Sequence, residues 1–333
     1  MSDYAGAIGG ARRPACYYMR MLVHSSKYTT PLSEFGINKP FALDRGQLVM
    51  DRLKREVDPA LVAREPEPIS REQALLVHTE PYINSLEDPA VWHQIFELKP
   101  HEYSPQKAVR PLNELFNDIA FKSGGTVLAT RLAFEYGLAA NLGGGYHHAF
   151  PDRGRGFCAL HDVAIAIRCA QREKRIRRVL IVDVDFHQGD GSAVIFKDDP
   201  DVFTLSIHSE EGWPEEKQKS DLDVPIYQAD QHLYVEKLEA AVRQTLKKFA
   251  PQLVLFIAGS DPYELDVLPG TNFIKLPLGE MRRRDEFVLE TFAGLGVPLA
   301  MVFAGGYGPD VWEVHYWAVR RLVELSNMQR IAK

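Results

Sequence analysis

Cysteine is scarce in this chain: Cys16, Cys158 and Cys169 are the only three among 333 residues. Three cysteines do not make a disulfide framework, so the count favours a reducing compartment. No apolar run approaches the roughly 20 residues that a membrane-spanning helix needs. The start of the sequence, MSDYAGAIGGARRPACYYMR, also has no apolar core of the kind found in a signal peptide. These absences predict a cytoplasmic protein with no membrane partner.

An excess of positive charge is absent as well. Lys and Arg number 39 against 45 Asp and Glu, which gives a formal net charge of −6. This balance gives no support to bulk nucleic-acid binding. The basic run at residues 172–178 (REKRIRR) fits the solvated end of a helix, where cations interact favourably with the helix dipole. We therefore expect no nucleic-acid partner, and composition leaves the oligomeric state open.

Apolar runs alternate with helical patterns along the chain. Strands are expected at residues 17–23, 139–142, 179–184, 202–207, 253–258 and 299–304. Helices are expected at residues 41–56, 113–136, 163–172, 233–248, 280–293 and 311–325, with a further helical start at Ser70. Strands separated by helices predict an α/β fold with a mainly parallel sheet and helices on both faces. There is no repeat and no obvious linker, so we expect one domain over residues 1–333, with residues 1–16 as an N-terminal tail.

The segment Asp183-Val184-Asp185-Phe186-His187 carries the strongest chemical signal. It follows an apolar run at residues 179–182 that is typical of a buried parallel strand. Side chains alternate along a strand, so Asp183, Asp185 and His187 are expected to project to one side. Two carboxylates and an imidazole are costly to bury without a cation. The segment therefore predicts a metal site at the carboxyl end of a strand, where open α/β sheets bind ligands.

Four other segments follow the same pattern, in which polar or glycine-rich residues come directly after an apolar run. They are residues 141–148 (NLGGGYHH), 206–208 (SIH), 258–261 (AGSD) and 304–308 (AGGYG). If the sheet is parallel, all of them lie on one rim. Packing alone does not explain why separate strands deliver His, Asp, Tyr and Gly to one place, so the pattern indicates an active site.

Taken together, these motifs resemble the zinc-dependent histone deacetylase family. GGGYHH, DRGRGFCALHD, DVDFHQGDG, AGSD and AGGYG appear in the family's order and approximate spacing, and the similarity runs from about Val23 to Leu325. The pattern DRGxGFC after GGGxHH is most similar to the class IV branch and its bacterial relatives, within the superfamily that includes acetylpolyamine amidohydrolases. The resemblance implies a single-domain arginase/deacetylase fold with a sheet of about eight strands.

The resemblance implies three metal ligands: Asp185, His187 and Asp261. Two carboxylates, one histidine and an open position for water suit a catalytic Zn²⁺. Such ligation does not exclude Fe²⁺ or Co²⁺. Because two carboxylates formally cancel the charge of the ion, a separate proton acceptor is needed.

Two histidines match the family's proton acceptor and its partner. By the resemblance, His147 pairs with Asp183 and His148 pairs with Asp190, and each carboxylate orients its imidazole and raises its basicity. His148 would take the proton of the attacking water and return it to the leaving amine, while His147 acts mainly through its charge. Tyr307 would donate a hydrogen bond to the substrate carbonyl oxygen.

The resemblance also implies a set of substrate contacts, most of them apolar side chains. The backbone carbonyl of Gly145 would accept from the substrate amide, Phe157 and Trp213 would wall the stem of the acylated amine, and Leu268 would complete this set.

The family also carries a monovalent cation beside the zinc. The matching positions are Asp183, Asp185, His187, Ser206 and Ile207, the last two through backbone or hydroxyl oxygens. We expect K⁺ there.

The leading hypothesis is a zinc amidohydrolase that removes an acetyl or other acyl group from the ε-amine of lysine in a protein or peptide. The alternative is the same chemistry on a small acylated amine such as an acetylpolyamine. An acidic entrance would favour it, and Glu210 and Glu211 either form such an entrance or merely face water. A catalytically silent binding module and a two-metal, arginase-like ureohydrolase are disfavoured, because every catalytic position is present and DVDFHQGDG does not supply the ligands of a second ion.

Overall fold

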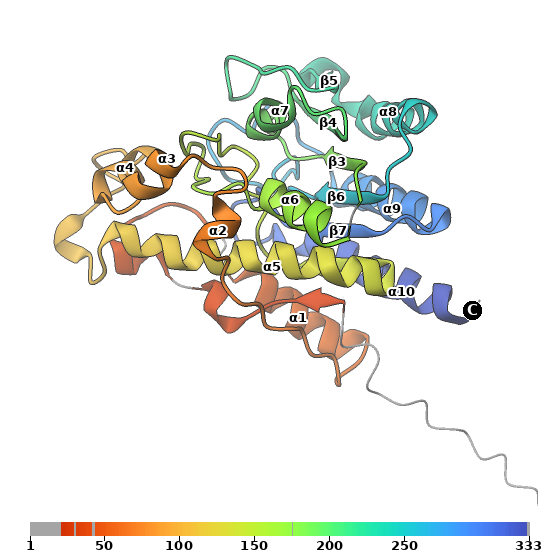
Figure 1. Ribbon diagram of the computed structural model, residues 1–333, viewed down its shortest axis with the longest axis horizontal. Coiled ribbons are helices and arrows are strands. Elements are labelled where there is room, and N and C mark those ends of the chain that lie inside the picture. The colour runs from red at the N-terminus through yellow and green to blue at the C-terminus, as the bar shows by residue number, and fades with distance from the viewer. Residues whose placement is uncertain (1–20, 30, 42–43, 175, 332–333) are drawn as a thin grey trace, which may run out of the picture.

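A parallel β-sheet forms the centre of the structure, a computed structural model that describes residues 21–29, 31–41, 44–174 and 176–331. In spatial order its seven strands are β1 (Leu22–Val23), β2 (Leu138–Asn141), β7 (Leu299–Val302), β6 (Leu253–Ile257), β3 (Val179–Asp183), β4 (Val202–Ser209) and β5 (Leu222–Ile226). Every pair of neighbouring strands is parallel. Figure 1 labels strands β3 to β7 of this sheet. The parallel sheet predicted from the sequence is therefore confirmed, with seven strands in the described residues rather than about eight.

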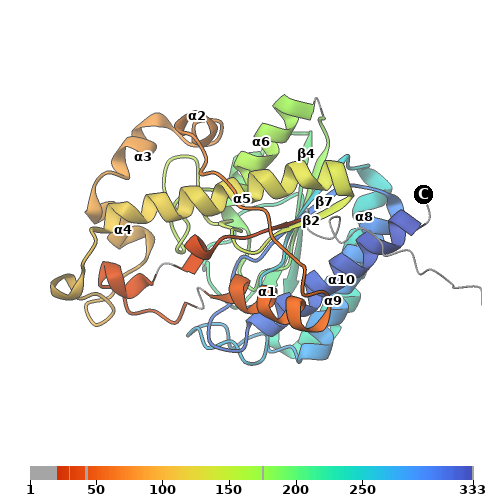
Figure 2. The same ribbon diagram turned by 90° about the horizontal axis from the view of Figure 1, so that it is seen from below.

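Helices cover both faces of this sheet. Their bounds are α1 Arg45–Glu56, α2 Arg71–Ala74, α3 Glu80–Ser85, α4 Pro89–Ile95, α5 Leu115–Tyr136, α6 Asp162–Lys174, α7 Asp190–Phe196, α8 Tyr234–Lys248, α9 Leu278–Leu295 and α10 Trp312–Ile331. Figure 2 shows α5 and α6 on one face and α9 and α10 on the other. Connections between parallel strands are right-handed, so helices that lead to opposite edges of the sheet pack on opposite faces. None of the described helices combines the length and the apolar character needed to cross a membrane.

Short 3₁₀ helices occupy several of the connections. They are η1 Ser26–Thr29, η2 Leu32–Phe35, η3 Pro105–Lys107, η4 Leu112–Glu114 and η5 Gln228–Leu233. The helical start expected at Ser70 is present, since the Ser70 side chain accepts from Gln73 N while the Gln73 side chain accepts from Ser70 N. This capping box begins α2, which ends after one turn.

The main differences from the sequence-based elements have simple physical reasons. Strand β5 was not predicted because Pro225 interrupts its pattern, and a proline is tolerated there because β5 lies at the edge of the sheet. Short helices α3, α4 and α7 were also missed, since fewer than two full turns give little periodicity. The first strand was expected from residue 17; residues 17–20, like the predicted tail at 1–16, lie outside the described residues.

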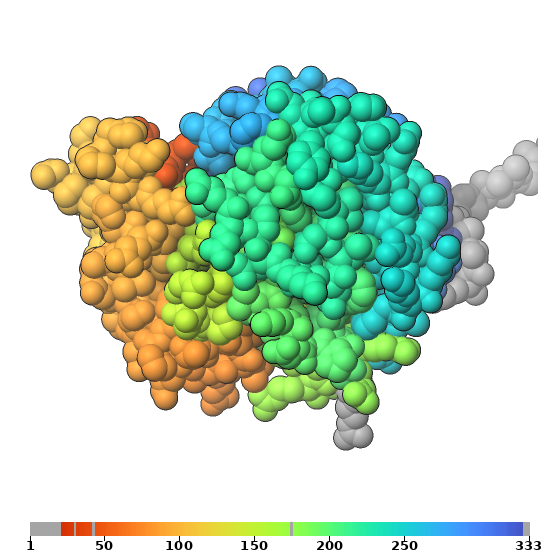
Figure 3. All heavy atoms as spheres, turned by 90° about the horizontal axis from the view of Figure 1, so that it is seen from above, coloured from red at the N-terminus to blue at the C-terminus, as the bar shows by residue number. Residues whose placement is uncertain are grey.

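Two hydrophobic clusters stabilise the described part of the chain. The sheet cluster joins the strands to α1, α5, α6, α8, α9 and α10 and contains Phe186, Phe303 and Ala304. The side cluster joins α3 and α4 to other residues of α5 and α6, and it contains Trp92, Phe96 and Leu160. In Figure 3 the segment around α3 and α4 (orange) lies beside the part of the chain that carries β3 to β5 (green and teal).

Helix α5 passes very close to the segment that precedes α2. Gly124 is the contact point, because a β-carbon there would collide with the carbonyl oxygen of Glu67 and lie 3.3 Å from the nitrogen of Ile69. The hydrogen bond from Ile69 N to the Ala120 carbonyl, 3.0 Å, holds the segment against the helix. The close approach therefore requires glycine at this position.

Replacing Gly124 by Ala should lower the free energy of unfolding by about 1–3 kcal/mol, the usual cost of overpacking a tight site. Urea unfolding followed by circular dichroism measures this change. The matched control is Gly294→Ala in α9, where a β-carbon meets nothing within 4 Å and should be neutral or stabilising. Equal unfolding midpoints for the two variants would contradict the packing argument.

Candidate metal centre and active site

The chemistry-bearing segments meet at one rim of the sheet. Residues 143–148 follow β2, Asp185 and His187 follow β3, Asp261 follows β6, and residues 305–307 follow β7. Because the strands are parallel, their carboxyl ends lie side by side. One detail of the sequence argument was wrong: β3 ends at Asp183, so Asp185 and His187 lie in the following loop and are not oriented by strand alternation.

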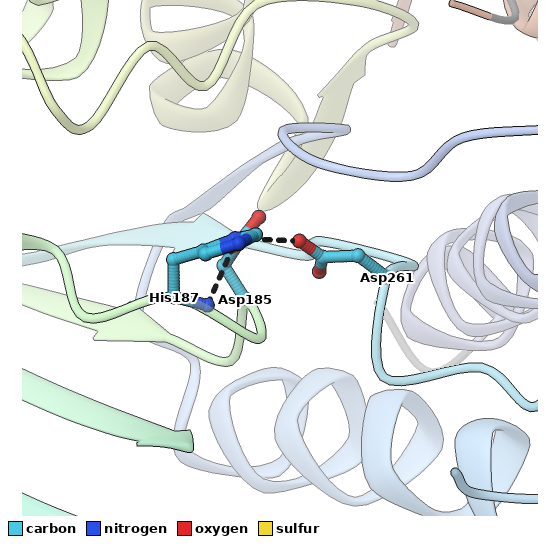
Figure 4. A group of neighbouring side chains, drawn as sticks. All are labelled: Asp185, His187 and Asp261. Carbon is cyan, nitrogen blue, oxygen red and sulfur yellow. Dashed lines mark hydrogen bonds and ion pairs between the residues drawn. The ribbon is translucent and has the colours of Figure 1, made fainter. Parts of the chain in front are cut away.

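Asp185, His187 and Asp261 form a compact buried cluster that could hold a metal ion. Each offers a ligand atom, and these atoms lie within 4.8 Å of one another. Nδ1 of His187 is 3.1 Å from Oδ1 of Asp185 and 3.0 Å from Oδ2 of Asp261 (Figure 4). The loops are held in register by the hydrogen bonds Phe186 N to Asp261 Oδ1, 2.9 Å, and Gly305 N to Asp185 Oδ2, 2.8 Å.

The residues present fit a divalent cation. Two carboxylates and an imidazole are the donor set of a catalytic zinc site or of a related transition-metal site. Oδ2 of Asp261 is buried, and its ion pair with Nδ1 of His187 does not have the geometry of a hydrogen bond. Gly305 keeps the space beside the carboxylates open, because a β-carbon there would collide with Oδ2 of Asp261 and approach Oδ2 of Asp185 to 2.5 Å.

The protonation of this cluster shows how strongly it attracts positive charge. Burial alone would lower the pKa of His187, but Asp185 and Asp261 raise that pKa to about 10. Burial, together with the neighbouring Asp185 charge, raises the pKa of Asp261. Burial acts in the same direction on Asp185, but the imidazoles of His147 and His187 outweigh it and hold its pKa well below the ordinary value. A cation would relieve the repulsion between the two carboxylates.

His147 and His148 lie directly beside this cluster, and each contacts a buried carboxylate. Nδ1 of His147 is 2.7 Å from Oδ2 of Asp183, and Nδ1 of His148 is 2.6 Å from Oδ1 of Asp190. The two ring centroids are 3.9 Å apart. An ionised carboxylate only accepts hydrogen bonds, so Nδ1 of each histidine carries a proton and Nε2 is the nitrogen that can exchange one.

The two histidines differ in charge because their surroundings differ. Burial opposes the charged form of His147, but Asp183 and Asp185 outweigh it and raise its pKa to about 9. Burial and the nearby His147 charge lower the pKa of His148 to about 4, despite Asp190. Asp190 also pairs with Arg155, whose Nη1 lies 3.1 Å from Oδ2 of that carboxylate. At neutral pH one imidazole is charged and the other is neutral, a separation typical of acid–base sites.

A cavity opens onto the metal cluster and the two histidines. Its lining includes Asp185, His187, Tyr307 and Phe157. The Phe157 ring lies 6.2 Å from that of Tyr307, and Phe41 lies 5.1 and 5.4 Å from the two of them. The cavity therefore has an aromatic wall next to its polar end.

The remaining predicted substrate contacts lie in different places. Trp213 packs edge-on against His148, with ring centroids 4.7 Å apart, but it does not line the cavity. Leu268 is half-buried in a turn, where its backbone nitrogen donates to Asp266 Oδ1, and it does not line the cavity either. Sequence alone does not separate these two from Phe157, since all three are apolar residues near the motifs.

The glycine-rich loop after β2 brings a backbone carbonyl close to the histidines. Gly145 has φ +85°, and a β-carbon there would lie 2.6 Å from the main chain of Ala304. Its nitrogen donates to Oδ2 of Asp162, 2.9 Å, and Tyr146 N donates to Oδ1 of the same carboxylate, 2.7 Å. The Gly145 carbonyl accepts from His147 N at 3.0 Å. Asp162 thus fixes the loop, a role that the sequence analysis did not assign.

The residues predicted to hold K⁺ also lie together. Asp183 and Ser206 are direct partners across the β3–β4 ladder, and Asp183 Oδ1 accepts from Asp185 N at 3.1 Å. Oγ of Ser206 lies 2.9 Å from Nδ1 of His208, and the neighbouring Ile207 is fully buried. Potassium binding there stays a prediction.

Sequence reasoning missed several charged residues around the cavity. Arg45 donates through Nη1 to the Gly305 carbonyl, 2.9 Å, and through Nη2 to the Ala304 carbonyl, 2.8 Å, so it holds the segment that carries Tyr307. Lys122 also lines the cavity, and burial lowers its pKa to about 8. Both side chains belong to predicted helices without a motif, so no local pattern marked them.

The sequence analysis also missed Asp266. Its Oδ2 accepts from the backbone nitrogen of Tyr307 at 2.7 Å, and its Oδ1 accepts from the Thr271 hydroxyl at 2.9 Å. A carboxylate in a loop carries no sequence pattern that separates such a backbone contact from a solvated turn.

Comparison with known proteins gives consistent relatives. The family model described as "Histone deacetylase domain" matches residues 39–323. "Histone deacetylase 2" of Arabidopsis thaliana is 33% identical over 86% of this chain and 74% of its own length. An uncharacterized protein of Picosynechococcus sp. is 43% identical over 58% of this chain and 64% of its own length, less than two thirds. A crystal structure described as an HDAC homolog complexed with SAHA superposes with a TM-score of 0.69 at 25% identity, covering 93% of this chain and 84% of the other.

A divalent cation should bind to the Asp185–His187–Asp261 cluster and raise the thermal unfolding midpoint, because a ligand that binds only the folded state stabilises it. Differential scanning fluorimetry with and without Zn²⁺ measures the shift. The shift should shrink as the pH falls, because Asp261, with its raised pKa, must lose its proton to bind the cation. Asp261→Asn should abolish the shift, and Asp198→Asn, at an exposed carboxylate, should retain it. An equal shift in both variants would place the cation elsewhere.

Proposed function

Because this chain belongs to the histone deacetylase family, we propose that it is a zinc-dependent amidohydrolase that removes acyl groups from the ε-amine of lysine in proteins or peptides. Hydrolytic deacetylation is the chemistry of the family. The proposal adds the metal, the acyl-lysine substrate and the roles of individual residues.

One observation carries the proposal. A pair of carboxylate-backed histidines of opposite pKa shift lines the same cavity as Asp185 and His187, which with Asp261 form the cluster that fits a metal ion. Packing does not account for so many buried ionisable groups in one place, since each costs free energy to desolvate. Such groupings are typical of hydrolytic sites in which water is activated and charge develops on a carbonyl oxygen.

His148 is the proposed general base. Its neutral imidazole has Nε2 available to accept a proton, because Nδ1 is held by Asp190 at 2.6 Å. In the first step it takes a proton from the attacking water, and in the second it gives that proton to the leaving amine. His147 stays protonated between Asp183 and Asp185, so its charge stabilises negative charge developing nearby.

The substrate carbonyl and amide have separate partners. The hydroxyl of Tyr307 is the proposed donor to the carbonyl oxygen, and the Gly145 carbonyl is the proposed acceptor for the amide N–H. Asp266 and Asp162 orient these two groups through the backbone hydrogen bonds described above. Positioned dipoles of this kind stabilise the developing oxyanion without reorganising.

Asp185, His187 and Asp261 are the residues that would hold the metal ion. When bound there, Zn²⁺ polarises the scissile carbonyl and lowers the pKa of a water molecule. The same ligands accept Fe²⁺, and availability then decides which ion is bound. Asp183, Ser206 and the neighbouring residues described above are the proposed K⁺ site.

The aromatic wall supports an aliphatic stem such as that of lysine. Phe41, Phe96 and Phe157 line the cavity and offer an apolar surface to methylene groups. The small-amine alternative would be favoured by an acidic entrance, but Glu210 and Glu211 do not line the cavity. We therefore propose acyl-lysine as the substrate class and use acetylpolyamine as the competing case.

Removing either proposed catalytic group should slow turnover without loss of metal. We expect His148→Ala to lower kcat by roughly 10²–10⁴-fold, the usual contribution of a positioned base. We expect Tyr307→Phe to lower kcat by roughly 10²–10³-fold, as for one oxyanion donor. Steady-state rates on an acetyl-lysine peptide and metal content by mass spectrometry test both.

Two exposed positions provide matched controls. His93→Ala and Tyr227→Phe make the same chemical changes outside the cavity and should keep the wild-type rate. Loss of metal in the His148 or Tyr307 variant, or a rate equal to its control, would contradict the assigned role.

Substrate class can be decided by direct comparison. Zinc-loaded protein should hydrolyse acyl-lysine peptides with a higher kcat/KM than acetylspermidine, because the aromatic wall favours an uncharged aliphatic stem. A panel of acetyl-, butyryl- and longer acyl-lysine peptides then gives the acyl preference. Higher kcat/KM for acetylspermidine would support the small-amine alternative, and no turnover of either class would refute the proposed function.

A further inference from the structure

A buried arginine lies behind the metal cluster, outside the cavity. Arg284 is on α9 and is fully buried. Its Nε donates to Oδ1 of the adjacent Asp285 at 2.8 Å, and Asp285 is buried as well. Burying an ion pair is costly and seldom a source of net stability. Net stability therefore does not explain why an arginine is buried at this place.

The guanidinium of Arg284 bridges the two segments that carry the metal-binding carboxylates. Its Nη1 donates to the carbonyl of Val184 at 3.1 Å and to the carbonyl of Gly259 at 2.8 Å. Val184 immediately precedes Asp185, and Gly259 stands two residues before Asp261. A single nitrogen thus joins the loop after β3 to the loop after β6.

The two loops need such a bridge because they carry like charges at very short range. A β-carbon at Gly259 would lie 2.8 Å from the Cα of Asp185, so the main chains nearly touch. Repulsion between the carboxylates of Asp185 and Asp261 acts to separate the loops. The positive charge of Arg284 attracts Asp261, and its two hydrogen bonds resist that separation.

Tyr234, on another helix, also holds the Val184 carbonyl. Its hydroxyl, at the start of α8, donates to the Val184 carbonyl at 3.1 Å. With Arg284 this satisfies both lone pairs of that carbonyl. The backbone directly before Asp185 is therefore fixed from α8 and α9 together.

We propose that Arg284 is a positioning residue for the metal centre: by joining the Val184 and Gly259 carbonyls it sets the distance between the carboxylates of Asp185 and Asp261, and hence the affinity and geometry of the bound ion. This inference rests on the proposed metal site. Tyr234 is the auxiliary donor in the same arrangement.

The test uses Co²⁺, whose visible absorption reports the ligand geometry directly. The full-length protein, freed of metal by a chelator, is titrated with Co²⁺ to obtain the Kd and the spectrum. The main variant is Arg284→Met with Asp285→Asn, which removes both charges and leaves no unpaired ion buried. Arg283→Met is the matched control, since it removes an exposed cation on the same helix whose ion pair is with Glu280.

The double variant should bind Co²⁺ roughly 10- to 100-fold more weakly than the wild type, the usual effect of removing a group that orients metal ligands. Its absorption spectrum should change, and Arg284→Lys, which keeps the charge but not the planar fork, should recover part of the affinity. The Arg283 variant should match the wild type. A folded double variant with wild-type Kd and spectrum would overturn the inference, even if its thermal midpoint fell.

A second comparison covers the case in which the double variant does not fold. Tyr234→Phe removes only the hydroxyl donor to Val184, and it should change the Co²⁺ spectrum and weaken binding several-fold. Wild-type values for both Tyr234→Phe and Arg284→Lys would then overturn the inference. A wild-type protein that binds no Co²⁺ would refute the metal site itself, and the positioning role with it. The measurements therefore distinguish failure of the metal site from failure of the positioning role of Arg284.

Discussion

The concentration of buried negative charge at one rim of the sheet is the constraint on which the rest of the site depends. Asp183, Asp185, Asp190 and Asp261 are all at most 1% exposed. In a low-dielectric interior, four unneutralised carboxylates would repel one another and destabilise the rim. Each of these carboxylates therefore contacts a positively charged or hydrogen-donating group, and many of the hydrogen bonds and ion pairs at this rim are of this kind.

The groups that contact these carboxylates come from different parts of the chain. Histidines from the loop after β2 contact Asp183 and Asp190, and backbone N–H groups of Phe186 and Gly305 contact Asp261 and Asp185. Glycine is required where these loops cross, since a β-carbon at Gly259 or Gly305 would collide with the carboxylates of Asp185 and Asp261. At the metal cluster two carboxylates share the single imidazole of His187, so negative charge exceeds its positive partners there, and a divalent ion fits this place.

The sequence predicted the parallel sheet, which the structure confirms, because buried strands leave a strong local pattern. The site residues were proposed from the polar motifs that follow those strands, and their roles stay predictions. Runs such as residues 179–182 are apolar throughout, as expected for strands buried on both faces, and the polar motifs follow them directly. The edge strand β5, with Pro225, lacked that pattern. Arg45, Asp162 and Arg284 could not be found either, because their roles depend on backbone carbonyls and amides that only the folded chain brings near them.

The metal cluster and the aromatic wall of the cavity are supported by different hydrophobic clusters. The metal centre is built on strand ends within the sheet cluster, whereas the aromatic wall of the cavity, through Phe41, Phe96 and Phe157, belongs to or packs against the side cluster. Substitutions in the wall therefore disturb a different set of contacts from those that hold the ligands. Under the proposed function, substitutions in the wall would alter which acylated amines enter the cavity while the ligand-bearing loops keep their own supporting contacts.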